Sequence, residues 1–228
     1  MDLPGWVPDT DEARQDFAAV QGIISVMDQG VGMILDALHE YNLVDNTWLI
    51  FVTDHGLAMP RAKGNLYDPG IETSLLMRWS AHNFCDGKRE DALISHVDIV
   101  PTILEAIGAD IPQNLQGVSL WDRLTNHTTP PNDHIFAEKT FHTAYEPMRC
   151  IRTKQHKLIL NLDVGALVVP ADVQDSPFYP QVMRRVMAKR PYLELYDLQA
   201  DPLEMNNLAG EPEMKGIQSE LQAKLLDW

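Results

Sequence analysis

The chain has 228 residues, 45% of them hydrophobic, and a formal net charge of −15 at pH 7. This length suffices for one domain with a full core, or for one domain with a small satellite. The acidic balance argues against nucleic acid and anionic membrane surfaces as partners, because both require a basic footprint, but a metal ion or a local lysine can still make a cleft bind an anionic substrate.

The first predicted element is a long amphipathic helix. Asp9 or Thr10 can cap it, and apolar side chains then recur at helical spacing to about residue 41. Gly30 and Gly32 lie inside this pattern, which is typical of close packing against another backbone. A doubly wound sheet has several strands before such a helix. Either the sheet is small, or the chain is the C-terminal part of something longer.

A buried strand is predicted at residues 47–53, and it ends in Asp54, His55 and Gly56. A helix, a short loop and a buried strand form one half of a βαβ unit. Open α/β sheets place their ligands at the carboxyl ends of strands. The turn that Gly56 permits would let Asp54 and His55 converge on one ion. A carboxylate suits hard metals, and imidazole suits zinc, a mixed-ligand calcium-type site or a sulfate oxygen. Taken alone, the triplet is also typical of a turn whose aspartate caps the next element.

Lys63 follows within one loop. Its ammonium could neutralise negative charge that develops on an ester oxygen, although a single lysine is also typical of an exposed surface. Strand, turn and lysine together indicate a metal-assisted site for an anionic ester.

The remaining predicted elements begin with a second strand at residues 73–79. His96 and Asp98 open a capped short helix at residues 95–108, where we expect them to be structural. Residues 109–133 are predicted to be loop-like, and residues 163–191 are predicted to be a long excursion from the antiparallel unit that follows. A smaller antiparallel unit is expected, with strands at residues 134–138, 147–153, 156–161 and 193–197. A closing amphipathic helix is expected at residues 211–228.

A polar cluster of Glu138, Lys139 and His142 lies at the edge of the antiparallel unit. These side chains would suit recognition of a hydroxylated, charged sugar, and the alternative is an exposed polar loop. Cys85 and Cys150 match no zinc or redox spacing, so we expect two unpaired thiols. No run of about 18 apolar residues predicts a membrane span.

Several motifs in fixed order carry a family resemblance over essentially the whole chain. They are Asp54-His55-Gly56, Lys63-Gly-Asn65-Leu-Tyr67, Val97-Asp98-Ile-Val-Pro101 and Glu194-Leu-Tyr196-Asp197 with the following Asp201-Pro202. This pattern resembles the C-terminal half of type I sulfatases, which belong to the alkaline-phosphatase-like superfamily. It is most similar to the heparan N-sulfatase (sulfamidase) branch and its bacterial relatives.

The resemblance implies an α/β fold: the C-terminal part of an alkaline-phosphatase-like sandwich, with a mixed sheet flanked by helices, plus a small C-terminal antiparallel α+β unit. Residues 1–133 would form the partial sulfatase core and residues 134–228 the C-terminal subdomain. It also implies a periplasmic or secreted location in bacteria, or a lysosomal-like one, and leaves the oligomeric state open.

The resemblance also implies site roles. Asp54 would be a Ca²⁺ ligand, and His55 would occupy the neighbouring metal or sulfate position, where the sulfamidase carries Asn. Lys63 would contact the sulfate, and Glu138, Lys139 and His142 would shape the sugar site. Phosphonate and phosphodiester hydrolases of the superfamily also carry His at the position of His55, so they remain an alternative.

The family's nucleophile is a formylglycine made in a Cys/Ser-x-Pro-Ser/Thr-Arg sequence, which this chain lacks. The resemblance therefore implies hydrolysis of a sulfate ester or sulfamate on a sulfated sugar or glycosaminoglycan, with the isolated chain catalytically incompetent. We also expect apolar sheet surface to be exposed. A non-catalytic glycan-binding remnant is the remaining alternative.

Overall fold

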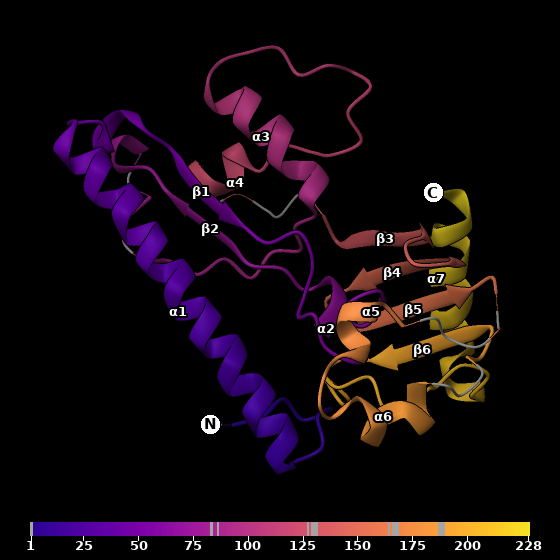
Figure 1. Ribbon diagram of the computed structural model, residues 1–228. Helices are drawn as coiled ribbons and strands as arrows, with labels where there is room; N and C mark the ends of the chain where they lie inside the picture. Colours follow the sequence, from indigo (N-terminus) through magenta and orange to yellow (C-terminus); the bar gives the residue numbers. More distant parts are fainter. Residues whose placement is uncertain are drawn as a thin grey trace. The chain divides into compact units, whose positions relative to one another are not determined.

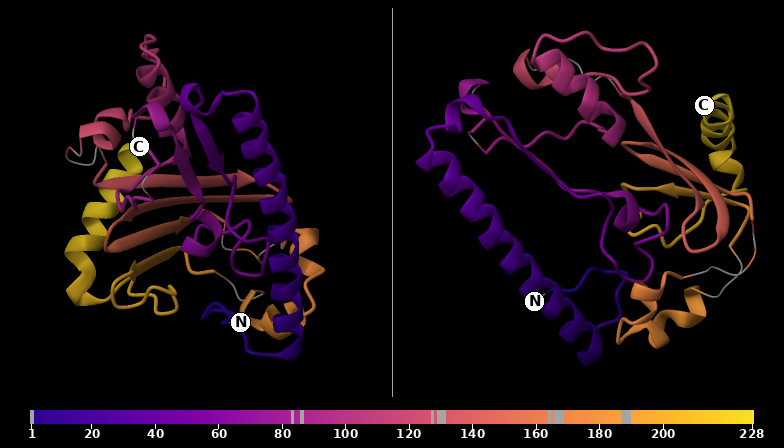
Figure 2. Two further views of the ribbon diagram at one scale, coloured as in Figure 1. Left: turned by 90° about the vertical axis from the view of Figure 1, so that its left-hand side faces the viewer. Right: turned by 45° about the horizontal axis from the view of Figure 1, so that its top comes forward.

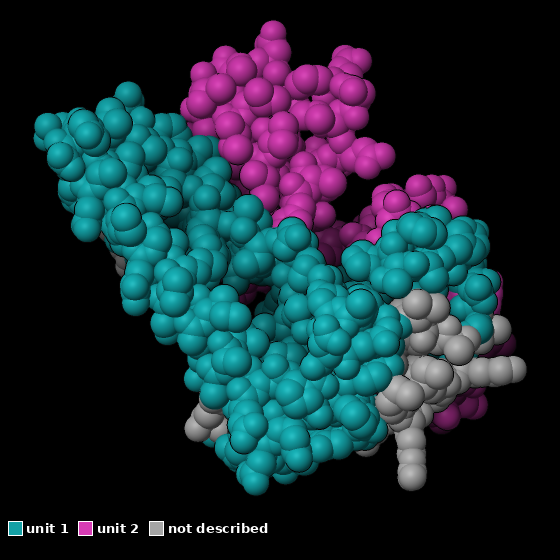
Figure 3. Space-filling view, viewed as in Figure 1, with its two compact units in different colours: residues 1–88, 139–147, 162–191 teal, residues 89–138, 148–161, 192–228 magenta. Residues whose placement is uncertain are grey.

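A computed structural model gives the structure of the chain. It describes residues 2–82, 84, 85, 87–126, 128, 132–163, 165, 169–186 and 190–228, with the backbone alone at 183–186. The chain forms two compact units, coloured separately in Figure 3. Unit 1 contains residues 1–88, 139–147 and 162–191, and unit 2 contains residues 89–138, 148–161 and 192–228. These units alternate along the chain, and the division into domains 1–133 and 134–228 stays a prediction.

Helix α1 of unit 1 spans Asp11–Glu40, which confirms the long predicted helix (Figure 1). The Thr10 side chain caps it by accepting a hydrogen bond from the Ala13 backbone N–H at 3.3 Å. The prediction that Gly30 and Gly32 pack closely against another backbone was wrong within the described residues. No atom lies within 4 Å of a Cβ placed at either glycine.

Strands β1 (Leu49–Val52) and β2 (Leu75–Arg78) confirm the two strands predicted in unit 1. They pair antiparallel, with Leu49 opposite Arg78, and form a two-stranded sheet. The prediction that β1 is buried was wrong. Its first three residues are half-buried, and Val52 is 44% exposed.

Apolar side chains are exposed on the β1–β2 sheet, as predicted from the sequence, and also along α1. On α1 they are Ile23, Ile24, Val26, Met27, Met33 and Ile34, and on the sheet they are Val52 and Leu76. Helix α1 is long and apolar enough to cross a membrane, by length and composition only. The sequence predicted no membrane span, because Asp28 and Asp36 interrupt the apolar run. Core helices of soluble proteins share these properties, so length and composition alone do not make α1 a membrane segment.

The core of unit 1 lies at the N-terminal end of α1. It joins that helix to the loop after β1 and to the segment around two short helices, α5 (Ala171–Gln174) and α6 (Tyr179–Val186), that were not predicted. Phe17 packs against Phe178, with 6.3 Å between ring centroids. The buried members are Val7, Ala13, Phe17, Met59, Ala62 and Phe178. The remaining elements of unit 1 are η1 (Val44–Asn46), α2 (Asp68–Ile71) and η2 (Ser80–His82).

A four-stranded sheet confirms the predicted antiparallel strands, in the order β3-β4-β5-β6. Its strands are His134–Phe141, Tyr145–Thr153, His156–Asn161 and Leu193–Asp197. In unit 2, helix α7 (Lys215–Asp227), which follows the short η4 turn (Pro212–Met214), lies along one face of this sheet (Figure 2). The core between them contains Ile151, Leu158, Leu160, Leu195, Leu221 and Leu225.

Helical segments η3 (His96–Asp98) and α3 (Ile99–Ala106) form the predicted capped helix of unit 2. Asp98 is buried, and its carboxylate accepts hydrogen bonds from the backbone of Ser95 and of Val118, each at 2.9 Å. This confirms its structural role. A further short helix, α4 (Trp121–Asn126), lies where a loop was predicted.

Candidate functional site

Asp54 and His55 lie in the turn directly after β1, as the sequence predicted. The Asp54 side chain is 90% exposed, and its Oδ1 lies 3.8 Å from His55 Nε2. The other ring nitrogen, Nδ1, lies 2.7 Å from the Gly56 carbonyl oxygen. In the neutral ring this contact places the proton on Nδ1 and leaves the Nε2 lone pair available to a metal ion or a hydrogen-bond donor.

These two residues fit part of a divalent metal site. A carboxylate oxygen and an imidazole nitrogen 3.8 Å apart can both reach one ion at the usual ligand distance of about 2.0–2.6 Å. Among the described residues, no group of three or more His, Cys, Asp or Glu could hold a metal ion. Asp54 and His55 are therefore two candidate ligands, without a third His, Cys, Asp or Glu beside them in the described part of the chain.

The loop from Gly56 to Gly70 is closed on itself. The Gly56 backbone N–H donates to the Gly70 carbonyl at 3.0 Å, and the Lys63 N–H donates to the Leu57 carbonyl at 3.0 Å. A Cβ at Gly56 would meet the Pro69 carbonyl oxygen at 1.9 Å. Only glycine permits so close an approach of two backbones, and Lys63 lies in this closed loop, which directly follows the candidate metal ligands in sequence.

The Lys63 ammonium points to a carboxylate. Its Nζ lies 2.5 Å from Asp172 Oδ2, with the lysine side chain 19% exposed and the aspartate side chain 50% exposed. This hydrogen bond from Lys63 lowers the pKa of the Asp172 carboxyl. The loop thus presents its cation to an oxyanion.

Lys139 is largely buried, unlike the exposed sugar contact that its sequence position suggested. Its Nζ donates to Glu146 Oε2 at 2.7 Å and to the Gly64 carbonyl at 2.8 Å. Arg190 donates to the other oxygen of Glu146 at 3.2 Å. Burial lowers the pKa of Lys139, and the bond with Glu146 acts in the opposite direction.

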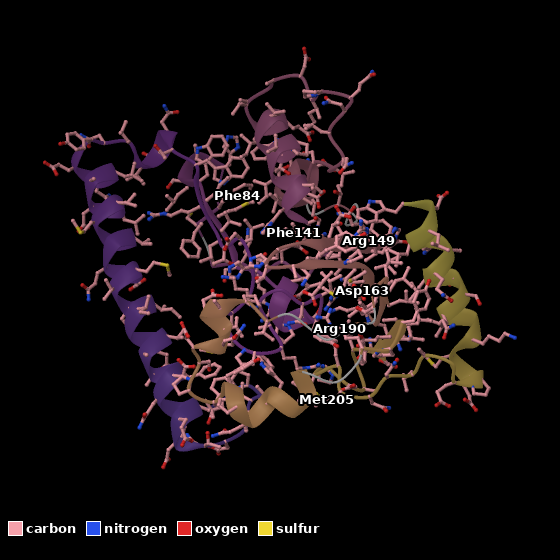
Figure 4. The ribbon with its side chains drawn as sticks, turned by 45° about the vertical axis from the view of Figure 1, so that its right-hand side comes forward. Phe84, Phe141, Arg149, Asp163, Arg190 and Met205 are labelled. Atoms are coloured by element: carbon pink, nitrogen blue, oxygen red, sulfur yellow. The ribbon has the colours of Figure 1, made fainter. Side chains whose placement is uncertain are left out.

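The other two predicted sugar-binding residues have exposed side chains. His142 lies in unit 1, where its Nδ1 is 3.0 Å from the Thr143 hydroxyl. Glu138 lies in unit 2, where it forms an ion pair with Arg149 at 2.8 Å (Figure 4, in which Arg149 is labelled). Unit 1 contains Asp54, His55, Lys63, Lys139 and His142.

Asp172, Glu146 and Arg190 are the contact residues that the sequence did not single out. Asp172 is 109 residues from Lys63 and lies in the excursion predicted at residues 163–191. Glu146 lies eight residues after Glu138 of the predicted polar cluster, and its pairing with Lys139 had no sequence signal. Such pairs follow from tertiary folding and have no short-range pattern.

Comparison with known proteins identifies two matching family models. Residues 4–109 match the sulfatase model, and residues 61–178 match the model of N-sulphoglucosamine sulphohydrolase, C-terminal. The chain is 30% identical to human N-sulphoglucosamine sulphohydrolase over 252 residues, which covers 99% of this chain and 50% of that protein. It is 30% identical to an ulvan-active sulfatase of Formosa agariphila over 244 residues, which covers 100% of this chain and 40% of that protein.

Solved structures show the same fold. One described as a 2-O GAG sulfatase superposes with a TM-score of 0.73 at 22% identity, covering 95% of this chain and 43% of that one. The chain thus spans half or less of the length of these relatives. The match over residues 61–178 extends over more than half of the chain, and with the match over residues 4–109 it shows that the chain belongs to the sulfatase family.

Proposed function

We propose that this chain supplies the C-terminal part of a sulfatase that hydrolyses sulfate esters or sulfamates on a sulfated sugar. One observation carries the proposal: Lys63 stands in a closed loop next to the candidate metal ligands and holds an oxyanion at 2.5 Å. A sulfuryl group offers the same kind of oxygen as the Asp172 carboxylate. The substrate would replace Asp172 as the partner of Lys63.

In this proposal Asp54 and His55 would hold a divalent cation, with Ca²⁺ the choice that the family favours. A bound cation would neutralise negative charge on the sulfuryl oxygens. Lys63 would add a hydrogen bond and a positive charge to one of these oxygens, an arrangement that favours a transition state with growing negative charge. His142, which has an exposed side chain and belongs to unit 1 like these three residues, would contact the sugar.

Similarity to human N-sulphoglucosamine sulphohydrolase favours an amino sugar or glycosaminoglycan as the substrate class. The same family membership favours a secreted, periplasmic or lysosomal-like location. The formylglycine nucleophile would come from sequence outside these 228 residues, since no Cys/Ser-x-Pro-Ser/Thr-Arg sequence is present.

Binding of inorganic sulfate to the chain tests this role of Lys63. We expect Lys63→Met to abolish sulfate-dependent NMR shifts in the loop 56–70. Asp172→Asn removes the competing carboxylate and should tighten binding by up to about fivefold, the range of a partly exposed ion pair. Asp175→Asn changes the same charge on an exposed neighbour and should leave sulfate affinity close to that of the unmodified chain.

Two results would contradict the proposed role. One is unchanged sulfate binding in Lys63→Met, and the other is equal tightening in Asp172→Asn and Asp175→Asn, which would reveal a general effect of net charge. Titration with Ca²⁺, Mn²⁺ and Zn²⁺ separates a sulfatase-type site from the phosphonate or phosphodiester alternative. Preference for two transition-metal ions would favour the alternative.

A further inference from the structure

We propose that Lys139, Glu146 and Arg190 form a positioning cluster that holds Lys63 in place, so that Lys139 acts through the loop and not on the sugar. This inference rests on the proposed function, because it assigns a support to the residue that would bind the sulfuryl group. We call these three side chains the loop clamp. Arg190 is labelled in Figure 4.

The loop clamp is a compact charged group with little access to water. Its three side chains are 10 to 11% exposed. Both oxygens of Glu146 are engaged, one by Lys139 at 2.7 Å and one by Arg190 at 3.2 Å. Charged hydrogen bonds in a region of low dielectric are strong and directional, so Glu146 fixes the position of the Lys139 ammonium.

Lys139 contacts the loop through a hydrogen bond to one backbone carbonyl. Its Nζ donates to the carbonyl of Gly64, which directly follows Lys63. Gly64 has φ of +77°, a conformation that side chains with a Cβ rarely adopt. By binding the Gly64 carbonyl, Lys139 restrains the backbone conformation of the residue that follows Lys63.

Other contacts also support the loop. Met59 and Ala62 are buried in the core with Phe17 and Phe178. The Lys63 backbone N–H donates to the Leu57 carbonyl at 3.0 Å, and the Asn65 side chain donates to the Lys63 carbonyl at 3.3 Å. The loop clamp adds a charged hydrogen bond to the carbonyl of Gly64, one residue after Lys63.

A direct role of Lys139 on the substrate fits the geometry less well. Two hydrogen-bond directions of its ammonium are taken by Glu146 and Gly64, and its side chain is 11% exposed. To contact a sugar, the Lys139 ammonium would have to move away from Glu146. The largely buried Glu146 carboxylate would then lose one of its two cationic partners, which is unfavourable.

Hydrogen exchange and sulfate binding on the 228-residue chain test the inference together. In Lys139→Met we expect the amides of Lys63 and Asn65 to exchange about tenfold faster and sulfate to bind about tenfold more weakly, because a charged hydrogen bond to the loop is lost. The amides of β5 should keep their protection. Lys154→Met removes a positive charge from an exposed side chain and serves as the matched control.

Glu146→Gln is the second variant, since it keeps the shape of the side chain if Lys139→Met fails to fold. It should give the same local pattern. Equal loss of protection in β5 and in the loop would overturn the inference, because it would show a purely global effect. The inference would also fail if the loop amides exchanged, and sulfate bound, within about twofold of the unmodified chain. If Lys63→Met binds sulfate normally while Lys139→Met still loosens the loop, the proposed function fails and the clamp stands as a structural device.

Discussion

Three lysines in this chain show that the partner of a residue, and not its type, determines what the residue can do. Lys63 faces a half-exposed carboxylate, which a substrate anion could replace. Lys139 is held by Glu146 with both side chains 11% exposed. Lys157 and Glu204 form an ion pair at 2.7 Å with both side chains fully buried. These contacts support the proposed binding role of Lys63 and the proposed positioning role of Lys139, and the full burial of Lys157 favours a structural role.

Removing one partner of the fully buried pair should be costly. We expect Lys157→Met to lower the free energy of unfolding by about 3–5 kcal/mol, because Glu204 would remain buried without its cation. Urea denaturation measures the difference. Lys224→Met breaks an exposed pair with Glu220 on α7 and should cost no more than about 0.5 kcal/mol. Similar losses in the two variants would contradict this assignment.

At the scale of elements, local patterns predicted the positions of helices and strands better than their surroundings. The predicted limits of β5 and β6 match the structure, and α1 begins at its predicted cap, because hydrophobic period and capping are local properties. The apolar run of β1 predicted burial, yet β1 is half-buried to exposed in the described chain. An apolar run shows that a strand is suited to a covered position, but it does not show what covers it.

The candidate site follows the same division. Asp54, His55 and Lys63 could be predicted because strand, turn and loop are continuous in sequence. The contact of Lys63 with Asp172 could not, since it joins residues 109 positions apart through a helix of four residues that has no periodic signal. The role of Lys139 stays a prediction, and its burial against Glu146 and Arg190 depends on tertiary folding.

Two glycines in unit 1 should respond to alanine in opposite directions. A Cβ at Gly70 would lie 2.3 Å from the Ala62 carbonyl oxygen, so Gly70→Ala must open the loop and should cost about 1–3 kcal/mol of stability. Gly22 lies in α1 with no atom within 4 Å of such a Cβ, so Gly22→Ala should add about 0.5–1 kcal/mol through helix propensity. Thermal and urea unfolding measure both. Stabilisation by Gly70→Ala would show that the loop is not closed as described.

At the scale of the whole molecule, the chain belongs to the sulfatase family and spans half or less of the length of its relatives. It contains two candidate metal ligands, Asp54 and His55, and in Lys63 one candidate for the sulfate contact. The apolar side chains exposed on α1 and on the β1–β2 sheet fit surfaces that are covered in a larger assembly. Both observations are consistent with a part that requires further protein for activity.

The isolated chain should therefore show no sulfatase turnover. With Ca²⁺ present, we expect hydrolysis of an aryl sulfate or of N-sulfoglucosamine to stay at the background rate, because the chain has no formylglycine sequence. Turnover above background that disappears in Asp54→Ala would refute this expectation. Turnover that persists in Asp54→Ala would indicate a contaminating enzyme.

The bond between Gly56 and Gly70 has a consequence for how this family can change. The Gly56 N–H and the Gly70 carbonyl join the two ends of the loop to each other, while Met59 and Ala62 between them pack in the core of unit 1. The loop is therefore closed at its ends and fixed to the core at two internal positions. Grafting the corresponding segment of a relative between Gly56 and Gly70, with Met59 and Ala62 retained, should then transfer its anion preference and keep the register of β1 with β2.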